Sequence, residues 1–324
     1  MAGINSCVAA LEAVLFSRLW ARQPLNEEPV FILGHPRTGT THLHNLLALD
    51  GRFAYATILQ AGFPSSFLCC ELFKGLLAPI LDSTRPMDNM AISFDTPAED
   101  ELATNVLTGG ISPYMPITLM KSHKDFAKYY TFQDASPAEL KAWMDSFLGF
   151  LRKVTYRHGG TKPLLIKSPV HTARVRLLLR LFPKAKFIYI HRHPLQVFQS
   201  AAHMADTYYW YCYLQRPSDQ DITSFILDQY DCLYRTYLKD RELIPPGNLV
   251  EVSFAELDHD PLGTLRSIYH RFGWGNFEEV LPRLKGYCAS LSDFKKNDHS
   301  RLPPEVEDMV RVRWADSFKT FGYR

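Results

Sequence analysis

Apolar residues form short continuous runs at several places in the chain, without the polar alternation of a half-exposed strand. Such runs are typical of strands that are covered on both faces of a sheet. They comprise residues 29–33, 164–166 and 186–190, and a further short strand is predicted at 249–252. Apolar residues at helical spacing predict helices over residues 42–49, 172–181 and 221–238. Strands that alternate with helices indicate an α/β fold: a single domain with a central, mainly parallel sheet flanked by helices.

The apolar stretch near the N-terminus, residues 8–20, contains Glu12 and Arg18. It is too short and too charged to cross a bilayer, which requires about 20 apolar residues. We therefore expect no transmembrane segment but an amphipathic helix that packs on the domain, with attachment to a membrane surface as the alternative. The expected division is an N-terminal helix within residues 1–28 and one domain over residues 29–324.

Two predicted helix starts in the middle of the chain share one pattern. Thr96 and Ser136 are each followed by Pro-Ala-Glu. A hydroxyl residue can cap a helix, proline favours its first position, and glutamate at the third position can complete a capping box. The pattern predicts capping boxes between Thr96 and Glu99 and between Ser136 and Glu139.

Composition narrows the classes of function. The 324 residues include 36 Lys and Arg against 34 Asp and Glu, a net charge of +2, which is too balanced for a typical nucleic-acid-binding protein. Six cysteines without a CxxC pair disfavour both a disulfide framework and a cysteine zinc site, and favour a reducing environment. The histidine pairs lack a convincing third ligand, so we expect neither a nucleic-acid partner nor a metal.

The spacing Gly34-x4-Gly39, between a predicted strand and a predicted helix, is that of a nucleotide-binding P-loop. Backbone amides at such a turn and at the helix N-terminus form a concave anion site. Arg37 adds a fixed positive charge, and Thr40 and Thr41 add hydroxyl donors. Thr40 stands where an ATPase or kinase has lysine, which disfavours a Mg²⁺-dependent NTPase.

A second candidate anion site follows the strand predicted at 186–190. Arg192 comes at the end of this strand, so its guanidinium is expected at the carboxyl edge of the sheet, where open α/β folds bind ligands. Pro194 can begin the next helix, and Ser200 lies two turns along it. A guanidinium and a hydroxyl suit a phosphate group, whereas a structural salt bridge is the alternative.

Together the two segments resemble the sulfotransferases that use 3′-phosphoadenylyl sulfate (PAPS). The resemblance runs from about residue 29 to the C-terminus and implies a P-loop-NTPase-like sulfotransferase fold. It also implies that PAPS is the co-substrate and that adenosine 3′,5′-bisphosphate (PAP) is the product. The residues it assigns to the 5′-phosphosulfate are Arg37, Thr38, Gly39, Thr40 and Thr41. Those it assigns to the 3′-phosphate are Arg192, Ser200 and, in a late basic stretch, Lys296 or its neighbour Lys295.

The resemblance points to a Lys-Ser-Pro segment for the chemistry. Lys167 is expected near the transferring sulfuryl group. Cytosolic members of the family have a histidine base where this chain has Pro169, so the nearest histidine, His171, is the first candidate base. Other branches use a glutamate soon after the phosphate loop, near the position of Gln60 here. Glu99 is the second candidate base, because it begins a run of three acids that exceeds what a helix cap needs.

The predicted activity is metal-independent, in-line transfer of SO₃ from PAPS to a hydroxyl group, or less favourably an amine, of a small-molecule or glycan acceptor. A P-loop nucleotide kinase and a catalytically inactive PAPS- or PAP-binding module are the alternatives. The aromatic run at 208–213 is either core packing or part of an apolar acceptor pocket.

Overall fold

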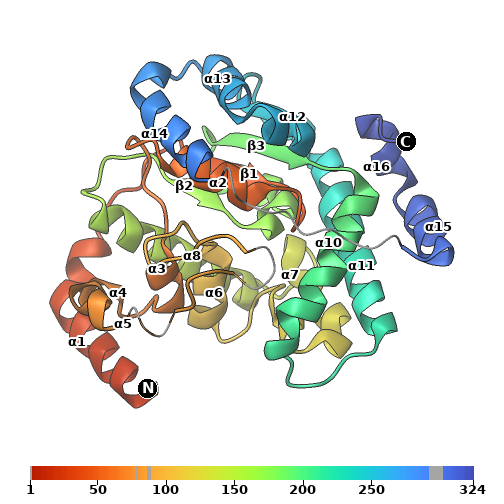
Figure 1. Ribbon diagram of the computed structural model, residues 1–324. Coiled ribbons are helices and arrows are strands. Elements are labelled where there is room, and N and C mark those ends of the chain that lie inside the picture. The colour runs from red at the N-terminus through yellow and green to blue at the C-terminus, as the bar shows by residue number, and fades with distance from the viewer. Residues whose placement is uncertain (1, 78, 80, 86–88, 292–301) are drawn as a thin grey trace.

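A four-stranded parallel sheet lies at the centre of the computed structural model, which describes residues 2–77, 79, 81–85, 89–291 and 302–324 (Figure 1). The strands are β1 (Val30–Leu33), β2 (Leu165–Lys167), β3 (Lys186–His191) and β4 (Leu249–Ser253). Their order across the sheet is β2-β1-β3-β4. Ile32 pairs with both Lys167 and Ile188, which aligns the carboxyl ends of β1, β2 and β3. The predicted α/β architecture is confirmed.

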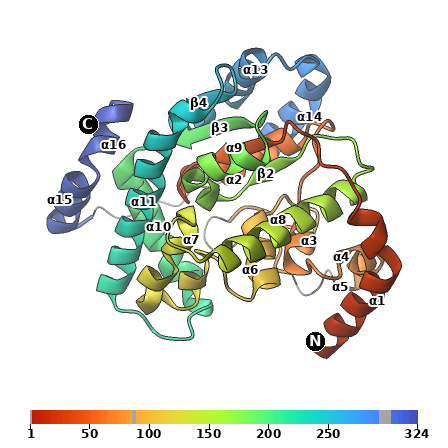
Figure 2. The same cartoon turned by 180° about the vertical axis from the view of Figure 1, so that it is seen from behind.

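Helices surround the sheet on both faces (Figures 1 and 2). In the first half of the chain they are α1 (Ala2–Trp20), α2 (Thr40–Ala48), α3 (Ile58–Gly62), α4 (Phe67–Cys70), α5 (Lys74–Leu77), α6 (Asp100–Thr108), α7 (Lys128–Thr131) and α8 (Pro137–Arg157). In the second half they are α9 (Val175–Leu181), α10 (Pro194–Thr207), α11 (Asp219–Asp240), α12 (Phe254–His259), α13 (Pro261–Arg271), α14 (Phe277–Ser290), α15 (Pro304–Arg313) and α16 (Ala315–Phe321).

The two faces of the sheet bury different sets of side chains, because successive residues of a strand point to opposite faces. Phe31 and Phe187 pack in one core cluster with Trp143 of α8 and with residues of α9 and α11. Ile32 and Ile188 pack in a second cluster with residues of α2, α13 and α14. The continuous apolar runs of the sequence therefore correspond to strands that are covered on both sides.

The first of the two predicted capping boxes is wrong, and the second is confirmed. Ser136 and Glu139 form the expected reciprocal cap of α8. Residues 96–98 are instead held beside the loop before α3: Ala98 N donates to Ala56 O at 2.8 Å, and Pro97 forms a bridge with Thr57. Because this pairing occupies the backbone, α6 begins only at Asp100, and Glu99 takes the N-cap position without capping through its side chain.

The helix predicted over residues 172–181 is divided in the structure. A short 3₁₀ segment, Pro169–Ala173, precedes α9, which begins only at Val175. The 3₁₀ residues are all buried, and Thr172 Oγ1 exchanges hydrogen bonds with the backbone of Gly34. Tertiary contacts thus shape this segment more than helix periodicity does.

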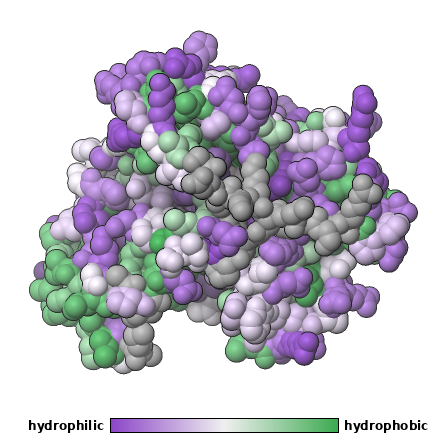
Figure 3. Space-filling model, viewed as in Figure 1, coloured by the Kyte–Doolittle hydropathy of each residue, from purple (hydrophilic) through white to green (hydrophobic). Residues whose placement is uncertain are grey.

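Helix α1 packs on α8 and α4 at one end of the molecule, and it begins six residues before the start predicted at residue 8. Its one carboxylate, Glu12, is buried, pairs with Lys153 of α8 and accepts a hydrogen bond from Cys69 N at 2.8 Å. Apolar residues gather on the outer surface of this region, at the lower left of Figure 3. In the described part of the chain, no helix could span a bilayer.

Candidate functional site

The loop between β1 and α2 has the strained backbone of an anion-binding turn. Arg37 and Gly39 have positive φ angles of 74° and 97°, and Gly39 forms the N-cap of α2. A Cβ atom on Gly39 would collide with the ring of Phe254, so only glycine fits here. The side chains of Thr38 and Thr40 are buried, and the Thr38 hydroxyl donates to His35 O within the loop. The backbone amide of Thr38 also donates to His35 O, so Thr38 shapes the loop, whereas the amides of Thr40 and Thr41, in the first turn of α2, have no partner within the helix.

The second predicted anion motif lies against the first. Arg37 Nε donates to Ser200 Oγ at 3.0 Å, and Arg192 Nη1 donates to the carbonyl oxygen of Arg37 at 3.1 Å. The guanidinium carbon of Arg192 lies 4.4 Å from the centroid of the Phe254 ring, which also contacts Gly39. The structure thus brings both motifs to one edge of the sheet.

This edge is strongly electropositive. Burial, together with the nearby charge of Arg37, lowers the pKa of Arg192 to about 10. Two guanidinium groups held so close repel each other, and a bound phosphate would relieve that repulsion through charge-assisted hydrogen bonds. Arg37, Arg192 and Ser200 consequently fit the phosphate groups of a nucleotide.

Lys167 supplies a third cation, from the strand beside the loop. It ends β2, its side chain is 3% exposed, and Nζ donates to Thr41 Oγ1 at 3.2 Å. Nζ also forms an ion pair with Glu99 at 2.6 Å. Burial lowers the pKa of Lys167, although Glu99 opposes this shift. Lys167 thereby places a positive charge at the start of α2, whose own sequence lacks the P-loop lysine.

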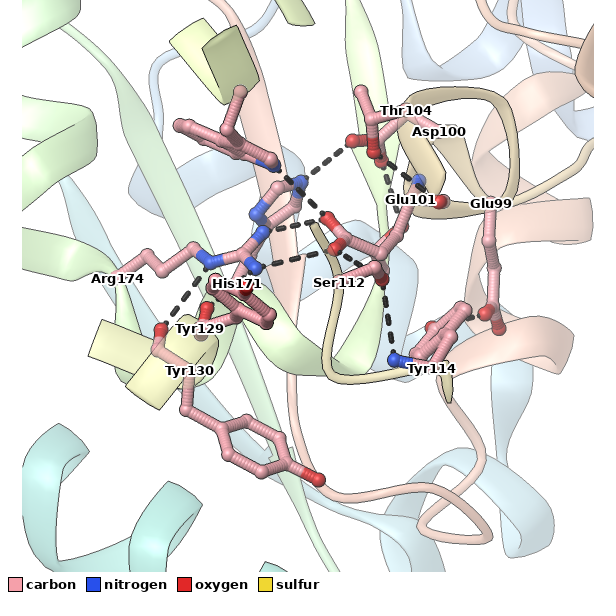
Figure 4. A network of polar contacts seen from close by, with 12 residues as sticks. Glu99, Asp100, Glu101, Thr104, Ser112, Tyr114, Tyr129, Tyr130, His171 and Arg174 are labelled. Carbon is pink, nitrogen blue, oxygen red and sulfur yellow. Dashed lines mark hydrogen bonds and ion pairs between the residues drawn. The ribbon is translucent and has the colours of Figure 1, made fainter. Parts of the chain in front are cut away.

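Glu99 is the carboxylate that faces this lysine. One oxygen pairs with Lys167, and the other accepts a hydrogen bond from the Tyr114 hydroxyl. Its side chain remains 25% exposed, so a substrate could reach it. Burial and the charge of Glu99 raise the pKa of Tyr114 well above its usual value, which keeps that hydroxyl protonated as a donor. Figure 4 shows Glu99 on the Tyr114 side of the network, apart from His171.

His171, the other candidate base, is enclosed in the core. Its Nε2 lies 2.8 Å from an oxygen of Asp100, and its ring packs between Phe31 and Phe147. The His171 and Asp100 side chains are 0% and 3% exposed. Burial disfavours the Asp100 carboxylate, but the charge and hydrogen bond of His171, helped by Ser168, lower the pKa of Asp100 below its usual value. The pair is therefore too deeply buried to reach an acceptor.

The sequence reasoning missed a third carboxylate network, centred on Glu101 and Arg174. Arg174 binds Glu101 through two nitrogens, at 2.6 and 3.2 Å, and both side chains are fully buried. Ser112 Oγ donates to Glu101 at 2.7 Å, and Arg174 also donates to the carbonyl of Tyr129 (Figure 4). The run of three acids was the available signal, but it did not reveal that each acid has a different partner.

The remaining predicted residues are placed as follows. Gln60 forms a capping box with Thr57 at the start of α3 and donates to Glu71 at 2.9 Å, which is a structural role.

Lys295 and Lys296 lie outside the described residues. In the aromatic run, Tyr209 is buried whereas Trp210 and Tyr211 are exposed. The described residues include no cluster of three or more His, Cys, Asp and Glu side chains suited to a metal ion.

Comparison with known proteins gives consistent matches. A family profile described as "Sulfotransferase family" matches residues 29–279. The chain is 34% identical over 320 residues to the omega-hydroxy-beta-dihydromenaquinone-9 sulfotransferase Stf3 of Mycobacterium tuberculosis and of Mycobacterium bovis, covering 99% of this chain and 81% of each relative.

Two solved structures share the fold. Sulfotransferase STF9 from Mycobacterium avium superposes with a TM-score of 0.70 at 18% identity, covering 98% of this chain and 82% of that one. Sulfotransferase STF1 from Mycobacterium tuberculosis H37Rv gives a TM-score of 0.67 at 18% identity, covering 95% and 81%. At this level of identity, the likeness concerns the fold alone.

Proposed function

The chain belongs to the sulfotransferase family, and from that membership we propose that it transfers a sulfuryl group from PAPS to the hydroxyl of a small, lipid-like acceptor. The single observation that carries the PAPS assignment is the contact between the two anion motifs. Arg37, Ser200 and Arg192 form one hydrogen-bonded group at the sheet edge, beside the start of α2. A nucleotide with phosphate groups at both the 5′ and the 3′ position of its ribose matches that arrangement.

Each predicted binding residue has a defined part in this proposal. The amides of Gly39, Thr40 and Thr41 face the 5′-phosphosulfate, while Thr38, whose amide and hydroxyl both donate to His35 O, holds the loop in shape. Arg192 and Ser200 hold the 3′-phosphate, while Arg37 lies between the two groups. Lys167 donates to Thr41 in the first turn of α2, so its charge lies beside the 5′-phosphosulfate. There it stabilises the negative charge that develops on the leaving phosphate as the bond to sulfur breaks.

We assign the general base to Glu99 in preference to His171. The acceptor hydroxyl gives its proton to the Glu99 carboxylate as its oxygen attacks sulfur in line with the departing phosphate. Glu99 suits this role because it is partly exposed and lies 2.6 Å from Lys167, which would face the same reacting group. His171 is enclosed by Asp100, Phe31 and Phe147, so its role is to hold the start of α6 against the sheet.

The acceptor class rests on the relatives and on the aromatic surroundings of Glu99. The curated relatives are named as sulfotransferases of a hydroxylated menaquinone derivative. In this chain the Tyr114 hydroxyl donates to Glu99, and the charge of Glu99, after burial as the main cause, contributes to raising the pKa of Tyr208 and of Tyr209. An aromatic surround suits an apolar alcohol better than a glycan.

Calorimetry with PAP tests the binding proposal. We expect PAP to bind more tightly than Mg²⁺·ATP, and Arg192→Ala or Ser200→Ala to weaken PAP binding about tenfold or more, since each removes a contact to phosphate. Arg266→Ala, which removes an exposed arginine that pairs with Glu278 on α14, is the control and should bind PAP normally. Absence of PAP binding, or a preference for Mg²⁺·ATP, would refute the proposal.

Turnover of labelled PAPS tests the transfer itself. A panel of isoprenoid alcohols, phenols and sugars should yield sulfated product with the apolar alcohols. Tight binding of PAP without product from any acceptor would identify the chain as an inactive binding module.

A further inference from the structure

The N-terminal helix α1 exposes an apolar face to solvent. Ile4, Leu11, Val14, Leu15 and Leu19 are each more than half exposed, and Val14 is 82% exposed. The charged residue Glu12 instead points inward to Lys153. A surface helix of a globular protein normally buries its apolar side and exposes its charges. Helix α1 instead exposes many of its apolar side chains and buries Glu12, one of its two charged residues.

A second segment extends this apolar face. The 3₁₀ turn Glu71–Phe73 and helix α5 follow α4, which packs against α1. Leu72, Phe73 and Leu76 in this segment are 78%, 60% and 79% exposed. Figures 1 and 2 both show α1, α4 and α5 together at one end of the molecule, and apolar surface predominates there in Figure 3. We call the eight exposed residues of these two segments the apolar face.

The described charges on α1 and directly after it that have no ion-pair partner are positive. Apart from the buried Glu12, the only charged residue of α1 is Arg18, which is exposed, and the exposed Arg22 follows the helix. In the second segment, Glu71 is paired with Arg157, and Lys74 is paired with Asp95. Apolar side chains flanked by uncompensated arginines match the interface of a bilayer that contains anionic lipids.

We propose that the apolar face docks the protein on the surface of an anionic lipid bilayer, with α1 lying in the plane of the interface. The helix is about 28 Å long at 1.5 Å per residue, long enough for several side chains to enter the acyl region together. None of the described helices could cross the bilayer, so the attachment is peripheral. This proposal goes beyond the sulfuryl transfer and does not depend on the identity of the acceptor.

The composition of the face favours lipid over a second copy of the chain. Protein interfaces concentrate binding energy in tryptophan, tyrosine and arginine side chains that fill complementary pockets. Seven of the eight residues of the apolar face are aliphatic, and the eighth is Phe73. The face lies at the outer edge of the molecule. A fluid acyl layer can accommodate such a protruding face without a matching shape.

Vesicle co-sedimentation tests the proposal with a closely matched pair of variants. Val14→Asp places a charge on the apolar face, whereas Val312→Asp places one on α15, far from it, at a valine that is 80% exposed. We expect the wild type to sediment with phosphatidylcholine vesicles that contain roughly one third phosphatidylglycerol, and less with phosphatidylcholine alone. Val14→Asp should reduce vesicle affinity about tenfold or more, and Val312→Asp should not.

The other outcomes overturn the proposal. If neither vesicle sediments the wild type, or if both variants weaken binding equally, the apolar face does not dock on lipid. If sedimentation velocity shows a dimer that Val14→Asp dissociates, the face is occupied by a second copy. PAP affinity, measured in parallel, should be the same in all three proteins, so a failure of vesicle binding is separable from a failure of the proposed function.

Discussion

Glu99, Asp100 and Glu101 are neighbours in the sequence, yet each carboxylate has a different partner. Glu99 faces Lys167 and Tyr114, Asp100 binds His171, and Glu101 binds Arg174. At the start of a helix, successive side chains point about 100° apart, so three adjacent residues can enter three separate environments. Only the first of these environments is open to solvent, which is why we assign the proton transfer to Glu99.

The base assignment predicts the effect of a single substitution. Glu99→Gln keeps the size of the side chain but cannot accept a proton, so we expect kcat to fall about a hundredfold or more with little change in PAP affinity. Glu139→Gln is the matched control: it changes the glutamate of the Ser-Pro-Ala-Glu motif, which caps α8 and pairs with Lys128 rather than Lys167, and should leave kcat near normal. Initial rates with labelled PAPS measure both.

His171→Asn discriminates between the two candidate bases. It breaks a buried pair and should lower the free energy of unfolding by about 3 kcal/mol or more. If the folded fraction of this variant loses more turnover than Glu99→Gln does, the base is His171 and our assignment is wrong.

At the scale of elements, the phosphate loop depends on a glycine that no other residue can replace. Gly39 has a φ angle of 97°, and its α-carbon lies against the Phe254 ring that also packs on Arg192. A change at Gly39 is therefore transmitted through Phe254 to the second anion motif. The sequence spacing predicted the loop, but nothing in the spacing identified Phe254.

We expect Gly39→Ala to weaken PAP binding about tenfold or more, because the added methyl group must displace Phe254. Gly247→Ala provides the control, since Gly247 also has a positive φ, 86°, but open space around its α-carbon. That control should lose only about 1 kcal/mol of unfolding free energy and keep its PAP affinity. Calorimetry and urea unfolding of both variants test this, and equal PAP affinities would contradict the role given to Phe254.

The helix starts show how far local patterns determine elements. The hydroxyl-to-acid capping pattern holds at Ser136, where the chain is free to form its cap. It fails at Thr96, because the following backbone pairs with the segment before α3. A capping motif is a local preference, and here a tertiary backbone hydrogen bond outweighs it.

At the scale of the molecule, buried polar groups connect the elements around the sheet. Arg174, before α9, binds Glu101 of α6 and the backbone carbonyls of Tyr129 and Tyr130 in α7. His35 and His44 are also buried, and burial lowers the pKa of each to about 3. Both imidazoles are therefore neutral in the folded protein over the physiological pH range.

Because these two histidines are buried and neutral, we expect the free energy of unfolding to depend on pH. The unfolded chain takes up protons at both residues below pH about 6.5, whereas the folded protein resists protonation until pH about 3. Their contribution to stability is complete well above pH 6.5 and, below that pH, falls by about 1.4 kcal/mol per pH unit for each histidine. From pH 7.5 to 5 the loss is about 4 kcal/mol in total. Carboxylates such as Asp100, whose pKa is lowered in the folded protein, also lose their contribution to stability, but at lower pH.

Urea unfolding between pH 7.5 and 5 measures this loss. His44→Leu should roughly halve the slope below pH 6.5, because one of the two titrating groups is removed. An unchanged slope in that variant would contradict the assignment to buried histidines, whatever its absolute stability.

The sequence by itself determined the order of strands and helices and the two anion motifs, Gly34-x4-Gly39 and Arg192 with Ser200. Those patterns are local, and in a parallel sheet every strand delivers its carboxyl end to the same edge, so local patterns suffice to bring the motifs together. Only the tertiary structure decided which acid meets Lys167, because that depends on how α6 is rotated against its neighbours. It also decided that α1 turns Glu12 inward and Val14 outward, since the partner Lys153 lies 141 positions further along the chain from Glu12.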